Sequence, residues 1–222
     1  MSHTGLLPHQ FLFRYSFPIR YERKLPRKGK KLLDLPAENR LPSLAGLDRS
    51  VPFGELRLAW NDDGLAISVQ VTGKVGPVQA DPRAPEAADG LQVLLDTRNT
   101  QSIHRASRYC QQFYLLPTGT GTRGVAPVAV SVPIVRAREE APRVDVTEIQ
   151  LQTTLLKSGY QLDVWFPSSV LPGFDPESQP RLGFYYALRD TELGEQFLSV
   201  GQDFPFAIDP SLWSTLELAG RI

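Results

Sequence analysis

Short runs in which apolar and polar residues alternate recur along this 222-residue chain, separated by turns rich in glycine and proline. The clearest two runs, residues 56–60 and 65–71, flank the turn sequence NDDG at residues 61–64. A period of two is typical of a half-buried β-strand, and Asx-Gly sequences favour the tight turn of a hairpin. Residues 56–71 are therefore predicted to form a β-hairpin.

The same pattern continues to the end of the chain and predicts an all-β protein. The 17 glycines and 19 prolines are expected in the turns between strands, and their density excludes a helical bundle. Only residues 167–171 indicate a helical turn. We expect residues 51–222 to form a single antiparallel β-sandwich, jelly-roll-like and of about ten strands. Its further strands are predicted at residues 89–96, 111–117, 125–135, 144–157, 160–166, 182–189, 197–200 and 213–218.

The first 50 residues differ from the rest and are interpreted as an extended N-terminal arm. Alternation over residues 11–19 predicts a first strand that joins the sheet, and Pro18 either places this strand at an edge or ends it. Residues 20–31 contain seven Lys or Arg and one Glu, a local charge of +6 that leaves −6 for the remainder. We interpret this basic segment as a solvated linker that protects an edge strand from pairing, with binding of an anionic partner as the alternative.

The overall charge limits which partners are expected, and the cysteine content indicates a cellular compartment. Lys plus Arg equals Asp plus Glu, 24 against 24, so no global field favours a nucleic acid or a membrane. Tyr21 is the only aromatic residue of the basic segment, which lacks the stacking surfaces of single-strand binding. The single Cys110 and the lack of a signal-peptide pattern favour a cytoplasmic location.

Six segments, taken in their order, carry a resemblance to a known family. In chain order they are ELRLAWNDDGLAISVQV, DGLQVLLDTRN, QFYLLP, SGYQLDVWFPSSVLPGF, RLGFYYALRDTE and DPSLWSTLEL. Together they resemble the family-nine carbohydrate-binding modules and the broader DOMON-like sandwich domains over about residues 53–218. The positions that match the acidic strand and the Gly-Tyr strand of that family are Asp89, Gln92, Asp96, Gly159, Tyr160, Leu162, Asp163 and Pro167.

The resemblance implies a non-catalytic module that recognises the ends of oligosaccharides or polysaccharides, in a glycan-degrading system. Its sugar-contacting positions fall on Gln92, Tyr114 and Phe206. The family's stacking tryptophan before the acidic strand falls on residues 85–88, which read PEAA here. Trp60, beside the acidic turn, is a further candidate for ligand contact, because flat aromatic side chains cover sugar rings.

A polar block between two predicted strands offers a second candidate site. Arg98, Asn99, His104 and Arg108, with Arg105 between them, lie within eleven residues. Guanidinium groups present rigid forks of donors that suit carboxylates and vicinal hydroxyls, so one interpretation is a loop that recognises an anionic or uronic sugar. The other is a solvated loop whose arginines pair with the carboxylates of Glu86, Asp89 or Asp96.

Several aspartates could supply oxygen ligands to calcium, the one cofactor that the sequence suggests. Calcium takes six to eight oxygens, and the candidates are Asp62, Asp89, Asp96 and Asp190, with Asp63 beside the first. Their spacing is not that of an EF-hand, and aspartates in turns also bind backbone amides.

Two functions other than sugar binding stay open. One is a structural or protein-interaction sandwich that has lost the sugar site, and the other is a hydrolase. A His104 and Cys110 nucleophilic pair is conceivable for an enzyme, but no G-x-S-x-G sequence, phosphate loop or histidine cluster is present. Carbohydrate is the leading ligand, and a protein partner is the alternative.

Overall fold

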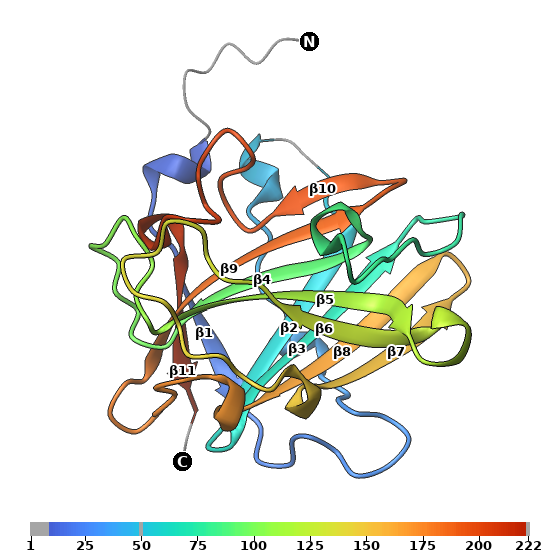
Figure 1. The fold of residues 1–222 in the computed structure, drawn as a ribbon, viewed down its shortest axis with the longest axis horizontal. Helices are drawn as coiled ribbons and strands as arrows, with labels where there is room; N and C mark the ends of the chain where they lie inside the picture. Colours follow the sequence, from blue (N-terminus) through green and yellow to red (C-terminus); the bar gives the residue numbers. More distant parts are fainter. Residues whose placement is uncertain (1–8, 49–50, 221–222) are drawn as a thin grey trace.

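The computed structural model describes residues 9–48 and 51–220, whose strands form one eleven-stranded sheet (Figure 1). The strand order is β6-β5-β4-β9-β11-β1-β2-β3-β8-β7, with β10 paired to β9. The strands are β1 (Ser16–Tyr21), β2 (Gly54–Asn61), β3 (Gly64–Thr72), β4 (Gly90–Asp96), β5 (Cys110–Thr120), β6 (Ala126–Ser131), β7 (Gln150–Leu156), β8 (Gly159–Pro167), β9 (Arg181–Asp190), β10 (Gly194–Phe197) and β11 (Ser214–Ala219). The all-β prediction is confirmed, and residues 56–71 form the β2–β3 hairpin.

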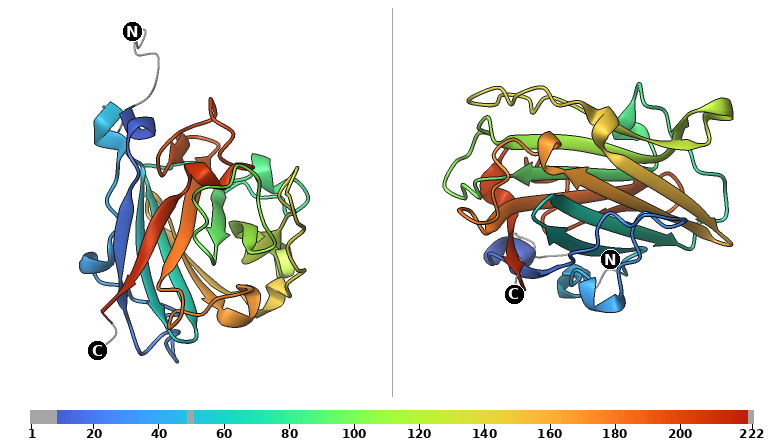
Figure 2. Two further views of the ribbon diagram at one scale, coloured as in Figure 1. Left: turned by 90° about the vertical axis from the view of Figure 1, so that its left-hand side faces the viewer. Right: turned by 90° about the horizontal axis from the view of Figure 1, so that it is seen from below.

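The sheet folds over on itself into a sandwich that is nearly a closed barrel. In the right-hand view of Figure 2, the green strands β4 and β5 lie above the teal strands β2 and β3. The edge strands β6 and β7 contact each other, which nearly closes the structure. Between the layers, the ring of Phe113 on β5 lies 5.2 Å from the ring of Phe166 on β8, and both residues are fully buried. This core forms because alternate residues of each strand face inward.

Strand β1 makes the sheet mixed. It pairs in parallel with β11 on one side and with β2 on the other, whereas every other pairing between described strands is antiparallel. The predicted edge position of this strand is therefore wrong. Pro18 is tolerated because β2 pairs only with Arg20 and Tyr21, so at Pro18 the strand has β11 alone as a neighbour.

The N-terminal arm covers the outer face of the sheet at β2, β3 and β8. Leu25, Leu33 and Leu35 pack there against Trp165 and two small residues, Ala59 and Ala66, which leave room for the leucine side chains. Backbone carbonyls of the arm are also bound: Asn61 Nδ2 donates to Leu25 O at 2.8 Å and Arg57 Nη1 to Leu35 O at 2.7 Å. The Lys and Arg side chains of residues 20–31 are exposed, in agreement with a solvated segment. The edge-guarding part of the interpretation is corrected, because β1 is not an edge strand and Leu25 of the segment is anchored on the sheet.

Among the residues that the structure describes, helical structure is confined to single turns of 3-10 helix. They are η1 (His9–Leu12), η2 (Ala37–Asn39), η3 (Ala45–Asp48), η4 (Pro85–Ala87), η5 (Thr122–Gly124), η6 (Val146–Glu148), η7 (Ser168–Val170) and η8 (Pro210–Leu212). The predicted turn at residues 167–171 is η7. No helix within residues 9–48 and 51–220 has both the length and the apolar character that a membrane span needs.

Candidate functional site

A row of side chains crosses the outer face of four strands. In register, Ala187 of β9 lies beside Gln92 of β4, Gln92 beside Tyr114 of β5, and Tyr114 beside Val130 of β6. Residues next to them along the strands, such as the fully buried Phe113, face the core, so the row faces away from it. Ala187, Gln92 and Tyr114 of this row line a hollow of about 300 Å³, the Gln92 hollow. Its other lining residues include Glu86, Arg189, Glu195 and Phe206.

The three positions that the resemblance assigned to sugar contact therefore line one hollow. Gln92 and Tyr114 are partly exposed, and Gln112 Nε2 donates a hydrogen bond to the Tyr114 hydroxyl at 3.2 Å. Burial and the neighbouring charge of Glu86 raise the pKa of the Tyr114 phenol, which stays neutral and can both donate and accept. Phe206 is only 5% exposed, because its ring stacks on Tyr185 at 4.6 Å. It offers the hollow an apolar rim and not an open stacking face.

Charged and amide groups that the sequence did not single out complete the wall of the Gln92 hollow. Arg189 Nη1 donates to the backbone carbonyl of Glu86 at 3.1 Å and lies 3.5 Å from Glu195 Oε1. Gln202 Nε2 donates to the same carboxylate at 3.2 Å. Arg189, Glu195 and Gln202 come from β9, β10 and the loop after β10, and of the three only Arg189 lies in a segment that carried the family resemblance.

Trp60 is covered and offers no surface to a ligand. Its side chain is 1% exposed, and its indole N–H lies 3.1 Å from the carbonyls of both Ile19 and Ala219. Tyr21 contacts the ring edge to face at a centroid distance of 5.0 Å. The prediction for Trp60 is corrected because β1 and β11 close over the strand end on which it lies.

The polar block lies away from the Gln92 hollow. It follows Asp96 at the other end of β4, about 13 Å along the strand from Gln92. The guanidinium carbons of Arg98 and Arg108 lie 4.7 and 5.1 Å from the ring centroid of Tyr109, within cation–π range. Asn99 Oδ1 accepts a hydrogen bond from the Thr215 hydroxyl at 3.1 Å.

Neither interpretation of the polar block matches its contacts fully. The guanidinium of Arg105 donates to the backbone carbonyls of Arg136 and Ala137, at 2.9 and 3.0 Å. The carboxylate of Asp96 accepts backbone N–H groups from Arg98 and Thr100, at 2.9 and 2.6 Å. The arginines thus bind Tyr109 and the backbone, whereas the loop interpretation paired them with carboxylates.

The four aspartates assigned to calcium do not converge. Within the described ranges, no group of three or more His, Cys, Asp or Glu side chains is placed to hold a metal ion. Asp62 binds the Tyr21 hydroxyl at 2.8 Å, and Asp96 binds backbone amides. Asp89 and Asp190 do meet, but around the ammonium of Lys74, at 3.0 and 3.1 Å. Lys74 supplies the positive charge at this place, which corrects the prediction of a calcium site there.

His104 and Cys110 do not form a nucleophilic pair. His104 is exposed, and its Nδ1 lies 3.1 Å from both Asp209 Oδ2 and the Ser211 hydroxyl. A catalytic triad needs the serine and the carboxylate on different ring nitrogens, so this group lacks that geometry. Cys110 is buried, and desolvation with the nearby charge of Asp96 raises the pKa of its thiol to about 12.

A test of the Cys110 thiol follows from this pKa. Iodoacetamide at about pH 8, near the usual titration range of cysteine, is expected to leave the folded protein unmodified, because both burial and protonation suppress the thiolate. Mass spectrometry should show full alkylation in urea under the same conditions. Alkylation of the folded protein at the rate of the unfolded chain would contradict the prediction.

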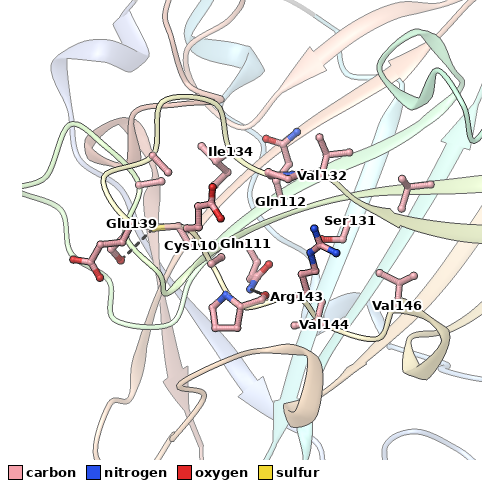
Figure 3. Close-up of a pocket in the computed structure, with 18 of the residues that line it drawn as sticks. Cys110, Gln111, Gln112, Ser131, Val132, Ile134, Glu139, Arg143, Val144 and Val146 are labelled. Carbon is pink, nitrogen blue, oxygen red and sulfur yellow. Dashed lines mark hydrogen bonds between the residues drawn. The ribbon is translucent and has the colours of Figure 1, made fainter.

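A larger cavity of about 770 Å³ lies near the start of β5 (Figure 3). One wall is Cys110, Gln111 and Gln112, and the other is a segment that leaves β6 and passes over the start of β5, residues 132–146, here called the strap. Gln111 Nε2 donates to the carbonyl of Pro142 in the strap at 3.1 Å. The sequence pattern does not indicate this strap cavity, because the strap has little regular structure and its apolar residues continue the alternation that predicts strands at residues 125–135 and 144–157.

Comparison with known proteins shows similarity only at the level of structure. No protein-family model matches the chain, and no curated protein sequence matches it. A family 9 carbohydrate-binding module from Caldicellulosiruptor kristjanssonii in complex with cellotriose is similar with a TM-score of 0.61 and 14% identity, covering 93% of this chain and 95% of that one. The same kind of module in complex with glucose gives a TM-score of 0.58 at 13% identity, covering 93% and 97%.

A third structure extends this likeness to another organism. A Bacteroides uniformis ATCC 8492 protein described as carbohydrate-binding is similar with a TM-score of 0.57 and 13% identity, covering 92% of this chain and 99% of that one. All three alignments run over nearly the whole length of both chains. The chain has the fold of the family-nine carbohydrate-binding modules.

Proposed function

We propose that this protein is a non-catalytic carbohydrate-binding protein that recognises the ends of oligosaccharide or polysaccharide chains in the Gln92 hollow. One observation carries the proposal: Gln92, Tyr114 and Phe206, assigned from three separate segments by family resemblance, line a single hollow. The structural neighbours, two of them in complex with cellotriose or glucose, support the same ligand class. A place in a glycan-degrading system is part of the proposal.

The chemistry of the Gln92 hollow suits a polyhydroxylated ring. The Gln92 amide, the Tyr114 phenol and the Arg189 guanidinium supply donors, and the carboxylate of Glu195 supplies an acceptor. Planar amide and guanidinium groups can bind two neighbouring hydroxyls at once. The rim of Phe206 offers apolar surface to the C–H groups of a ring.

Replacing Gln92 by alanine is the direct test of this assignment. We expect affinity for a binding oligosaccharide to fall about tenfold, or about 1.4 kcal/mol, at the upper end of the net contribution of one neutral hydrogen bond. Isothermal titration calorimetry with neutral and acidic oligosaccharides would measure it. The matched control is Gln150→Ala, because Gln150 is an exposed glutamine on β7 that does not line the hollow. Equal affinity of wild type and Gln92→Ala would contradict the assignment.

A second candidate is a protein-interaction sandwich without a sugar site. It is favoured by the covered ring of Phe206 and by Pro85 and Ala88, which line the Gln92 hollow where the family resemblance expects a stacking tryptophan. Failure of every oligosaccharide in the titration to bind would support this candidate. Release of reducing ends from any of those sugars would instead support the third function, a hydrolase.

A further inference from the structure

The Gln92 hollow is one of three hollows that adjoin along β5. Beside it lies an open hollow of about 530 Å³, the bridging hollow, lined among others by Arg83, Gln112, Tyr114, Val130, Pro133 and Ile208. Beyond the bridging hollow lies the strap cavity, of about 770 Å³. Each neighbouring pair shares lining residues, which is what a continuous trough requires.

The shared residues order the three hollows. Tyr114 and Glu86 line both the Gln92 hollow and the bridging hollow. Gln112 and Val132 line both the bridging hollow and the strap cavity. Tyr114, Gln112 and Cys110 point to the same side of β5, so the trough follows the strand over about 13 Å. That length is greater than a single pyranose ring.

The far end of the trough also has the chemistry of a sugar site. Gln112 presents a planar amide on the same side of β5 as Tyr114, and Gln111 presents a second amide toward the strap from the other side of the strand. Ser131 adds a hydroxyl and Arg143 a guanidinium, while Val132 and Val144 supply apolar wall (Figure 3). The N–H₂ group of Gln111 donates one hydrogen bond, to Pro142 O, and that of Gln112 donates one, to the Tyr114 hydroxyl. Each amide therefore has further donor and acceptor positions that a ligand can use. Polar groups set among apolar walls are typical of small-molecule sites.

The strap that covers this end is held in place at several points. The backbone N–H of Arg138 donates to Ala106 O at 2.7 Å, and the Arg105 guanidinium binds two strap carbonyls. With the Gln111 bond to Pro142, these contacts fix the strap to the polar loop and to β5. A cavity with a fixed wall is preformed for a ligand and needs little ordering upon binding.

We propose that the trough binds several consecutive units of a linear sugar chain, with the end unit in the Gln92 hollow and later units in the bridging hollow and the strap cavity. This inference rests on the proposed function, because it assigns the same ligand class to a longer site. It gives the polar groups of the strap cavity, which the chain-end function does not use, a role in selecting ligands by length.

The test compares ligand lengths in wild type and in a protein with a shortened trough. Ala141 lines the strap cavity and is half-exposed, so Ala141→Phe adds volume there without touching the Gln92 hollow. Arg143→Ala removes a polar group from the same cavity without adding volume. Val125→Phe is the matched control, since Val125 is 67% exposed and belongs to neither the hollows nor the strap cavity. Calorimetry would use glucose, cellobiose, cellotriose and cellotetraose, and the matching xylose series.

In wild type and in Val125→Phe, we expect the tetrasaccharide of the preferred series to bind about tenfold more tightly than the monosaccharide. Ala141→Phe and Arg143→Ala should lose most of that gain and keep the monosaccharide affinity. Equal affinity at all lengths in wild type, or an unchanged gain in both cavity variants, overturns the inference and leaves sugar binding at the Gln92 hollow intact. Failure of all lengths to bind overturns the proposed function as well.

Discussion

Replacing Lys74 by alanine is expected to lower the free energy of unfolding by about 3–5 kcal/mol, the cost of leaving buried charges without their partner. The Lys74 side chain is 2% exposed, and Asp89 and Asp190 are fully covered. Asp89 also accepts backbone N–H groups from Gln79 and Thr191, at 2.7 and 2.6 Å. Those bonds hold the carboxylate in place after the ammonium is removed, so the charge stays buried.

The pH dependence gives this prediction a second readout. Burial opposes the charge of Lys74, but hydrogen bonds and charges from Asp190 and Asp89 outweigh it and raise its pKa above the ordinary 10.5. The stabilisation from a raised lysine pKa is complete below the unfolded value and is lost as the pH rises through the folded value. The difference between wild type and Lys74→Ala should thus stay constant through neutral pH and shrink only above 10.5.

Urea unfolding monitored by tryptophan fluorescence would measure both effects. Lys157→Ala is the matched control, because Lys157 is an exposed lysine in the turn between β7 and β8, where removing the charge should change stability by less than about 0.5 kcal/mol. A loss in Lys74→Ala as small as that of the control would show that the cluster adds nothing to stability.

The second large effect is expected from Leu33→Ala, which should lower the free energy of unfolding by about 2–5 kcal/mol. Leu33 is fully buried although it follows a segment of Lys and Arg residues. Its side chain fills the space above Ala59, Ala66 and Trp165, and neither alanine can expand to close the cavity that the substitution leaves. The fluorescence of Trp165 should also shift to longer wavelength, since water gains access to that side of the ring.

Leu47→Ala is the control for this experiment. Leu47 lies in the same N-terminal arm but is 44% exposed, so its truncation should cost less than about 0.5 kcal/mol. Thermal unfolding of the two variants in parallel compares an anchored and an exposed leucine of the arm. Equal stability of both variants would mean that the arm is a dispensable cover, contrary to the packing around Trp165.

The sequence predicted the parts of this protein that local pattern controls. The alternation around residues 61–64 led to the β2–β3 hairpin, because turn chemistry and strand period agree over a few neighbouring residues. Gln92, Tyr114 and Phe206 were assigned by family resemblance, and the fold brings all three to one hollow. Nothing in their own segments would have indicated that they meet.

The failures of prediction have a common physical origin in distant contacts. The position of Trp60 beside an acidic turn predicts a ligand contact. In the fold its indole N–H is bound by the carbonyl of Ile19, 41 residues away, and by that of Ala219, 159 residues away. Asp89 and Asp190 are predicted as metal ligands from residue type, but the fold places the ammonium of Lys74 between their carboxylates. In both cases the decisive partner comes from a segment whose own sequence pattern says nothing about the site.

The place of β1 between β11 and β2 has a consequence for how the chain must fold. Phe17 lies beside Leu216 in the parallel pair, so this contact closes a loop of about 200 residues. The ribosome releases the N-terminal end first, so β1 cannot pair with β11 until the roughly 200 residues between them have been synthesised. Contacts between such distant residues slow folding, because the entropy of closing the loop is lost before the contact is gained. The sandwich is thus completed only once β11 has left the ribosome.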